Sequence, residues 1–139
     1  MISTVAVGTD GSETAEEAVG QAADIARRYG AKLVLLSAFP AQGGFAAYAG
    51  LELEWASSSQ ADVKKILERS ETALRQDGME CETRSAEGDP GDVLVRLAEE
   101  CDADLLVIGN KGMKRRLLGS VPNTVTHKAD CSVMVVKTT

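Results

Sequence analysis

Short apolar runs alternate along the whole chain with longer segments in which apolar residues recur every three or four positions. The short runs have the length of strands, and the longer segments have the periodicity of amphipathic helices. Such alternation is typical of an α/β protein, in which right-handed crossovers force the strands into a parallel sheet with helices on both faces. We therefore expect an α/β fold with an open parallel sheet.

Five segments are predicted to be strands. The third alternates in character and places Glu80, Glu82 and Arg84 on one face, which is typical of an exposed edge strand. The others are apolar runs, and the second is continuous, as in a strand covered on both faces. The predicted strands run from Ile2 to Val7, Ala31 to Phe39, Met79 to Ala86, Leu105 to Ile108 and Ser132 to Lys137.

Four helices are predicted between these strands. Ser12 or Thr14 can cap the first helix, and Asp89 followed by Pro90 is a typical start for the third. The fourth helix begins near Ser120. The second and third helices are predicted to bury Val63, Ile66, Leu67, Ala73 and Leu74, and Val93, Leu94, Leu97, Ala98 and Cys101, respectively.

Length and composition limit the classes of protein to consider. The 139 residues fit one domain, residues 1–139. The three cysteines form no CxxC pair, so neither a zinc site nor a disulfide framework is expected, and a reducing compartment is favoured. A net charge of −6 disfavours nucleic-acid binding, and no apolar run approaches the roughly 20 residues of a membrane span. With no secretory signal visible, we predict a cytoplasmic protein that binds neither nucleic acid nor membrane.

Two loops that follow strands carry unusual residues. In doubly wound sheets, ligands bind beyond the carboxyl ends of the strands, at the point where the strand order reverses. The first loop is Gly8-Thr9-Asp10-Gly11-Ser12, after strand one, and the second runs from Gly109 to Ser120, after strand four. We expect the binding site between these loops.

The second loop is suited to an anion. Gly109, Gly112 and Gly119 allow the backbone to approach a phosphate closely, and a helix start with the Ser120 hydroxyl offers further donors. The loop also carries four cations, Lys111, Lys114, Arg115 and Arg116. The alternative is that the glycines only turn the chain and the cations form a solvated surface, and spacing alone does not decide between the two.

Asp10 has two compatible interpretations. Its carboxylate can accept hydrogen bonds from a ribose, or bind magnesium beside phosphates. It can also cap the first helix or form an Asx-turn, which the residues alone favour. Neither loop has the GxxxxGK[ST] or GxGxxG pattern, so a P-loop NTPase and a dinucleotide-dependent dehydrogenase are not expected.

Several stretches of the sequence, taken in chain order, are similar to those of a known protein family. They are Val5 to Glu13, Gly88-Asp89-Pro90, Asp104 to Gly112, Leu117 to Pro122 and Ser132 to Val136. Together they resemble the universal stress protein family over nearly the whole chain, except from about Phe39 to Gln60. The resemblance implies a Rossmann-like, five-stranded parallel sheet of order 3-2-1-4-5, of the adenine nucleotide alpha hydrolase type. It also implies a dimer, with ATP between strands one and four in members that bind it.

The resemblance further implies roles for individual residues. Asp10 would meet the ribose, Ala38 and Ile108 would flank the adenine, and Lys111 would reach the phosphates. No built-in metal site is implied, and magnesium would enter only with the nucleotide, near Asp10. The residues implied to bind nucleotide are Gly8, Thr9, Asp10, Ala38, Ile108, Gly109, Lys111, Gly112, Gly119, Ser120, Val121 and Pro122.

One departure from the family pattern concerns the phosphate loop. Members that bind ATP have nine residues between the second and third glycines, whereas only six, Met113 to Leu118, separate Gly112 from Gly119 here. A shorter loop grips fewer phosphates, favours a smaller ligand such as cyclic AMP, or leaves the site without nucleotide. Some relatives bind cyclic AMP, and others bind no nucleotide.

The last strand is predicted to form a homodimer contact. Val133, Met134, Val135 and Val136 follow one another, and an uncovered edge of this kind would be prone to aggregation. Pairing with the same strand of a second copy removes that edge. The predicted function is a dimeric, stress-responsive regulatory module that binds an adenine nucleotide, most simply ATP. The alternatives are a dimeric interaction protein without nucleotide and a cyclic-AMP-binding member.

Catalysis is not expected. His127 is the only histidine and is predicted to lie on a helix surface. No residue in the two loops stands out as a base that could activate water, so slow ATP hydrolysis is the most that the sequence allows.

Overall fold

The fold was analysed from a computed structural model that describes residues 1–40, 60–110 and 120–137. Its five strands form one sheet in the order β3-β2-β1-β4-β5, and every neighbouring pair is parallel. The predicted open parallel sheet of order 3-2-1-4-5 is therefore confirmed. The strands are β1 (Thr4–Gly8), β2 (Lys32–Phe39), β3 (Glu82–Glu87), β4 (Leu105–Gly109) and β5 (Ser132–Val136).

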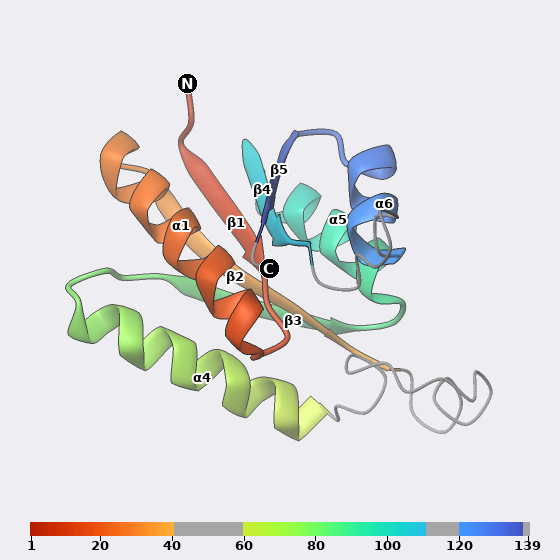
Figure 1. The fold of residues 1–139 in the computed structure, drawn as a ribbon, viewed down its shortest axis with the longest axis horizontal. Coiled ribbons are helices and arrows are strands. Elements are labelled where there is room, and N and C mark those ends of the chain that lie inside the picture. The colour runs from red at the N-terminus through yellow and green to blue at the C-terminus, as the bar shows by residue number, and fades with distance from the viewer. Residues whose placement is uncertain (41–59, 111–119, 138–139) are drawn as a thin grey trace.

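Four helices in the described part of the chain cover the sheet. They are α1 (Glu13–Tyr29), α4 (Gln60–Gln76), α5 (Pro90–Glu100) and α6 (Ser120–Lys128). Figure 1 shows α1 and α4 over one face of the sheet and α5 and α6 over the other. The predicted covering of both faces is thus confirmed.

The core consists of two apolar layers, one on each face of the sheet. Along β1, Val5 and Val7 pack in the layer beneath α1 and α4, whereas Ala6 packs in the layer beneath α5 and α6. The central strands β1, β2 and β4 are apolar on both faces because helices cover both. β3 carries its charged residues at the edge of the sheet, as predicted.

The start and end of α1 follow from local side-chain chemistry. The Ser12 hydroxyl accepts a hydrogen bond from the Ala15 amide at 3.2 Å and caps the helix, whereas Thr14 lies inside the first turn. Gly30 ends the helix in the left-handed conformation, with φ of 63°. Ser12 is therefore the cap, of the three candidates that the sequence offered, Ser12, Thr14 and Asp10.

The third strand begins later than predicted, at Glu82 rather than Met79. The Met79 amide donates to the Leu74 carbonyl at 2.8 Å and so closes the end of α4, after Gly78 has turned the chain with φ of 78°. An amide used by the helix end is not available to a sheet ladder. This competition explains the shift of the boundary.

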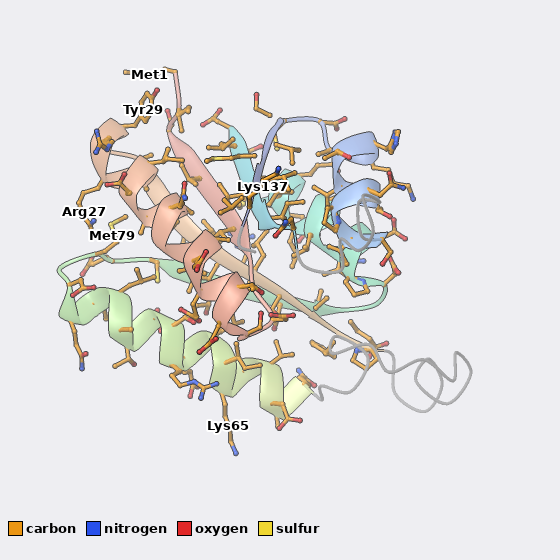
Figure 2. All side chains as sticks on the ribbon, viewed as in Figure 1. Met1, Arg27, Tyr29, Lys65, Met79 and Lys137 are labelled. Atoms are coloured by element: carbon orange, nitrogen blue, oxygen red, sulfur yellow. The ribbon has the colours of Figure 1, made fainter. Side chains whose placement is uncertain are left out.

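One residue assigned to a buried helix stripe is exposed. Ala73 of α4 faces solvent, whereas Ser70 of α4 is buried and its hydroxyl donates to Glu16 Oε1 of α1 at 2.8 Å. Tyr29 is 56% exposed at the C-terminal end of α1 (Figure 2). Figure 2 also shows Lys65 pointing away from α4 on its outer side. Periodicity alone does not show which positions of an apolar helix stripe extend beyond the element against which the helix packs.

Candidate functional site

A small hollow lies at the carboxyl ends of β1 and β4. The strand order reverses here, because β1 lies between β2 on one side and β4 on the other. The cavity volume is about 30 Å³, which is room for one or two water molecules. Its lining residues come from both strand ends, from α5 and from the starts of α1 and α6: Gly8, Asp10, Ala15, Leu94, Ile108, Gly109, Val121 and Pro122.

The loop after β1 is tied to the neighbouring strand β2. The last residue pair of the β1–β2 ladder is Gly8 with Leu36. Beyond it, the Thr9 amide donates to the Leu36 carbonyl at 2.9 Å, and the Ser37 hydroxyl donates to the Thr9 carbonyl at 2.7 Å. Thr9 and Ser37 are both buried, so this attachment is shielded from water.

The same loop then makes a tight turn. The Gly11 amide donates to the Thr9 hydroxyl at 3.1 Å, and Gly11 has φ of +83°, a conformation that favours glycine. A Cβ at Gly11 would lie 3.0 Å from the side chain of Ile66, which packs over the turn from α4. The backbone angle therefore favours glycine at this position, and the tight contact with Ile66 adds to that preference.

The Asp10 carboxylate is held in place within this turn. Its Oδ1 accepts hydrogen bonds from the Ser12 amide at 3.0 Å and from the Ser12 hydroxyl at 2.6 Å. This is the Asx-turn that the residues alone favoured. Since Asp10 also lines the hollow, the local turn and a contact with a ligand are compatible.

The wall of the hollow opposite the loop is apolar. Leu94 of α5 is fully buried, and a Cβ placed on Gly8 would lie 2.8 Å from its Cδ1 atom. Gly8 thus allows α5 to pack directly against the end of β1. Ile108 and Val121 extend the apolar wall, which is a suitable surface for the face of a purine ring.

The start of α6 is fixed by its contact with α5. A Cβ on Gly91 would lie 2.7 Å from Thr124 Cβ, so the two helices approach closely there. Lys128 Nζ, near the end of α6, contacts Asp92 Oδ1 of α5 at 2.9 Å, and this pairing raises the pKa of Lys128. These contacts determine where the first turn of α6 lies beside the hollow.

The structure brings half of the predicted nucleotide-binding residues into the lining. Three others are described but do not line the hollow: Thr9 is buried beneath the loop, Ala38 belongs to the core, and Ser120 is the exposed first residue of α6. Lys111, Gly112 and Gly119 lie outside the described residues. The predicted residues that line the hollow are Gly8, Asp10, Ile108, Gly109, Val121 and Pro122.

Sequence reasoning missed two lining residues, Ala15 and Leu94. Leu94 was assigned to the core because of its place on an apolar helix stripe, and Ala15 lies on the corresponding stripe of α1. Both are buried, so the pattern identified their environment correctly. No local signal in the sequence shows that their helices meet at this hollow.

The described residues were also searched for a metal site and for membrane spans. They contain no group of three or more histidine, cysteine or acidic residues that could hold a metal ion. Asp10, the one carboxylate among the lining residues that the structure describes, already accepts two bonds from Ser12. Among the described helices, none has the length and apolar character needed to cross a membrane.

A second hollow, of about 360 Å³, lies near the C-terminal end of α5 and the turn before β5. Glu99, Asp102 and Asp130 line it, and the pKa of Glu99 is raised by its hydrogen bond to Asp130 and by the charge of that carboxylate. Burial raises the pKa of the Cys131 thiol, which keeps it protonated. An acidic lining of this kind repels anions and makes the hollow unsuitable for a phosphate compound.

Comparisons with known proteins agree with this architecture. The model of the universal stress protein family matches residues 1–137. A universal stress protein of Mycobacterium tuberculosis is 41% identical over 142 residues, covering 98% of this chain and 97% of the relative. Two solved structures of universal stress proteins are also similar to this chain. Each of these two comparisons covers 99% of this chain.

The first of these structures is a complex with cAMP, with 37% identity, a TM-score of 0.80 and 99% coverage of both chains. The second is the universal stress protein from Archaeoglobus fulgidus in complex with dAMP, with 25% identity, a TM-score of 0.75, and coverage of 99% of this chain and 98% of that one. The family match spans both strand ends at the hollow and all the described helices. The chain therefore belongs to the universal stress protein family.

Proposed function

We propose that this protein binds an adenine nucleotide at the hollow between β1 and β4. One observation carries the proposal: Asp10 and an apolar wall that includes Leu94 and Ile108 line the same hollow. This hollow lies at the point where the strand order reverses. A carboxylate held in one orientation accepts hydrogen bonds from sugar hydroxyls, and the apolar wall packs against a base. The cAMP and dAMP complexes of the two similar proteins support this assignment.

The volume of the hollow limits how the ligand would lie. The hollow, at about 30 Å³, is smaller than a nucleotide, so only one part of the ligand would enter it. The phosphates would then lie toward the start of α6, where backbone amides at a helix N-terminus favour an anion. Magnesium would come with the nucleotide, because Asp10 alone does not make a metal site.

Two ligands of this class are supported by different observations. ATP is the ligand that the family resemblance of the two loops implies. Cyclic AMP is supported by the complex of the 37% identical structure and by the short stretch of six residues between Gly112 and Gly119. The single phosphate of cyclic AMP needs fewer amide contacts than the three phosphates of ATP, so a short loop suits cyclic AMP.

We infer a regulatory role rather than a catalytic one. The described lining residues include one carboxylate and no histidine, and His127 lies exposed on α6. We assign the carboxylate of Asp10 to the sugar, which leaves no other described lining residue that could activate water for attack on a phosphate. Slow hydrolysis of ATP is the most that this site would support. Stress response, homodimer formation and a cytoplasmic location stay predictions from the sequence.

Isothermal titration calorimetry with ATP, ADP and cyclic AMP, each with and without magnesium, tests the proposal. Asp10→Ala should weaken nucleotide binding by removing the acceptor for the sugar, and Gly119→Val should weaken it by placing a branched side chain in the phosphate loop. Asp24→Ala is the matched control, because it removes an exposed carboxylate from α1 away from the hollow.

The outcomes separate the candidate functions. A wild-type titration that stays flat at millimolar nucleotide would remove nucleotide binding and favour the interaction protein. Heats that persist undiminished in both Asp10→Ala and Gly119→Val would place the ligand elsewhere on the molecule. Thermal melting of each variant shows whether a lost heat reflects a lost fold.

A further inference from the structure

Ser37 is a buried polar residue in an otherwise apolar part of β2. Its exposed fraction is 1%, and its neighbours Leu35 and Phe39 on the same face belong to the core layer beneath α1 and α4. A buried hydroxyl is costly unless it is hydrogen-bonded. Ser37 Oγ satisfies this need by donating to the Thr9 carbonyl at 2.7 Å.

This bond lies where the chain leaves the sheet. The β1–β2 ladder ends at the pair Gly8 and Leu36, and the Thr9 amide still donates to β2. The Thr9 carbonyl, however, is bonded by a side chain rather than by a backbone amide of the ladder. The Ser37 hydroxyl therefore takes the place of a ladder amide in orienting the carbonyl through which the backbone leaves β1.

The constraint extends directly to Asp10. Thr9 is fixed at its amide by Leu36, at its carbonyl by Ser37, and at its hydroxyl by the Gly11 amide. Asp10 is the next residue, and its peptide bond includes the carbonyl that Ser37 holds. A change in that carbonyl's direction rotates this peptide bond and moves the Asp10 carboxylate relative to the hollow.

We propose that Ser37 is a positioning residue for nucleotide binding, whose hydrogen bond to Thr9 aligns the Asp10 carboxylate with the sugar hydroxyls of the ligand. The inference rests on the proposed function and goes beyond it, because Ser37 lies outside the lining of the hollow. A purely structural role for Ser37 would make its loss weaken all ligands of the site equally. A role through Asp10 makes the loss depend on the sugar hydroxyls.

The test measures the affinity of the wild type and of Ser37→Ala for two pairs of ligands by calorimetry. The pairs are ATP with 2′,3′-dideoxy-ATP, and cyclic AMP with 2′-deoxy-cyclic AMP. We expect Ser37→Ala to bind whichever parent nucleotide the wild type binds about five- to tenfold more weakly, the usual size for one buried hydrogen bond. Its affinity for the corresponding deoxy analogue should stay within about twofold of the wild type.

A matched control is Ser85→Ala. Ser85 is the register partner of Ser37 on β3 and is exposed, so this variant removes the same hydroxyl from the adjacent strand. We expect wild-type affinity for all four ligands. Should Ser37→Ala fail to fold, Ser37→Cys is measured in its place, since a thiol is a weaker donor of similar size.

Equal losses for the parent nucleotide and its deoxy analogue would overturn the proposal, and so would unchanged affinity for both. Failure of the proposed function has a different signature, because the wild type itself would then bind neither ATP nor cyclic AMP. That result would also refute the role of Ser37.

Discussion

Single residues fix both ends of β1, and at the amino end Asp104 has this role. Its Oδ2 accepts hydrogen bonds from the Ser3 amide at 2.8 Å and from the Thr4 amide at 2.9 Å. These two bonds hold the pKa of Asp104 below its ordinary value of 3.8, because they stabilise the charged form. One carboxylate thus joins the start of β1 to the start of β4, although about a hundred residues separate them.

The lowered pKa gives a stability prediction with a definite sign. A carboxyl group whose pKa is depressed by folding stabilises the fold above its ordinary pKa, and loses this effect as the pH falls through its value in the folded state. We expect Asp104→Ala to melt below the wild type at neutral pH, and the difference to shrink as the pH falls from about 5 to about 2.

Thermal melting followed by circular dichroism measures this difference. Asp24→Ala is the control, because Asp24 makes only an exposed pair with Arg28, which contributes little to stability. A difference between Asp104→Ala and the wild type that persisted undiminished at pH 2 would show that packing, rather than the two amide bonds, accounts for it.

At the scale of elements, the contact between α5 and α6 positions one side of the hollow. Gly91 allows close approach at Thr124, and Val121 and Pro122 of the first α6 turn then reach the lining. The helix pair therefore depends on a residue without a Cβ.

Two glycines in helices make a matched pair for testing this dependence. Gly91→Ala places a methyl group 2.7 Å from the stiff, β-branched Thr124, and we expect it to reduce the free energy of unfolding by about 1–3 kcal/mol. Gly20→Ala lies on α1 with no atom within 4 Å of its added Cβ, and we expect it to raise that free energy by about 0.5–1 kcal/mol. Urea denaturation measures both, and effects of the same sign would contradict this account of the helix contact.

At the scale of the whole molecule, the two edges of the sheet differ. β3 forms one edge and carries charge, whereas β5 forms the other with an apolar sequence. Val133, Met134 and Val135 are only partly buried, and Val136 is packed into the core. An apolar edge strand that presents unpaired backbone groups favours pairing with another strand.

We therefore expect a homodimer through β5, and Val135→Lys tests it. A lysine on this edge would bring like charges together across a two-fold contact, so the variant should be monomeric by light scattering at a concentration where the wild type is dimeric. Thr83→Lys, on the exposed β3 edge, is the control and should keep the wild-type mass. A Val135→Lys protein that stayed dimeric would exclude β5 as the contact.

The sequence by itself determined the α/β class, the number of strands and the two loops at the strand ends. These features are local: a strand buried on both faces needs an apolar run, and the capping side chains of Ser12 and Asp89 each accept a bond from an amide three residues away. The family resemblance of the loops added the strand order. Boundaries were less accurate where two elements compete for one group, as at the Met79 amide.

Only the tertiary structure decided which side chains meet at the hollow. Leu94 and Ala15 reach it because α5 and α1 pass on opposite faces of the sheet, and Ser37 bonds to Thr9 because β1 and β2 are in a particular register. Periodicity specifies that a residue is buried, but not its partner. The partner depends on the distance between helices and on strand register, and both are set by packing between segments far apart in the chain.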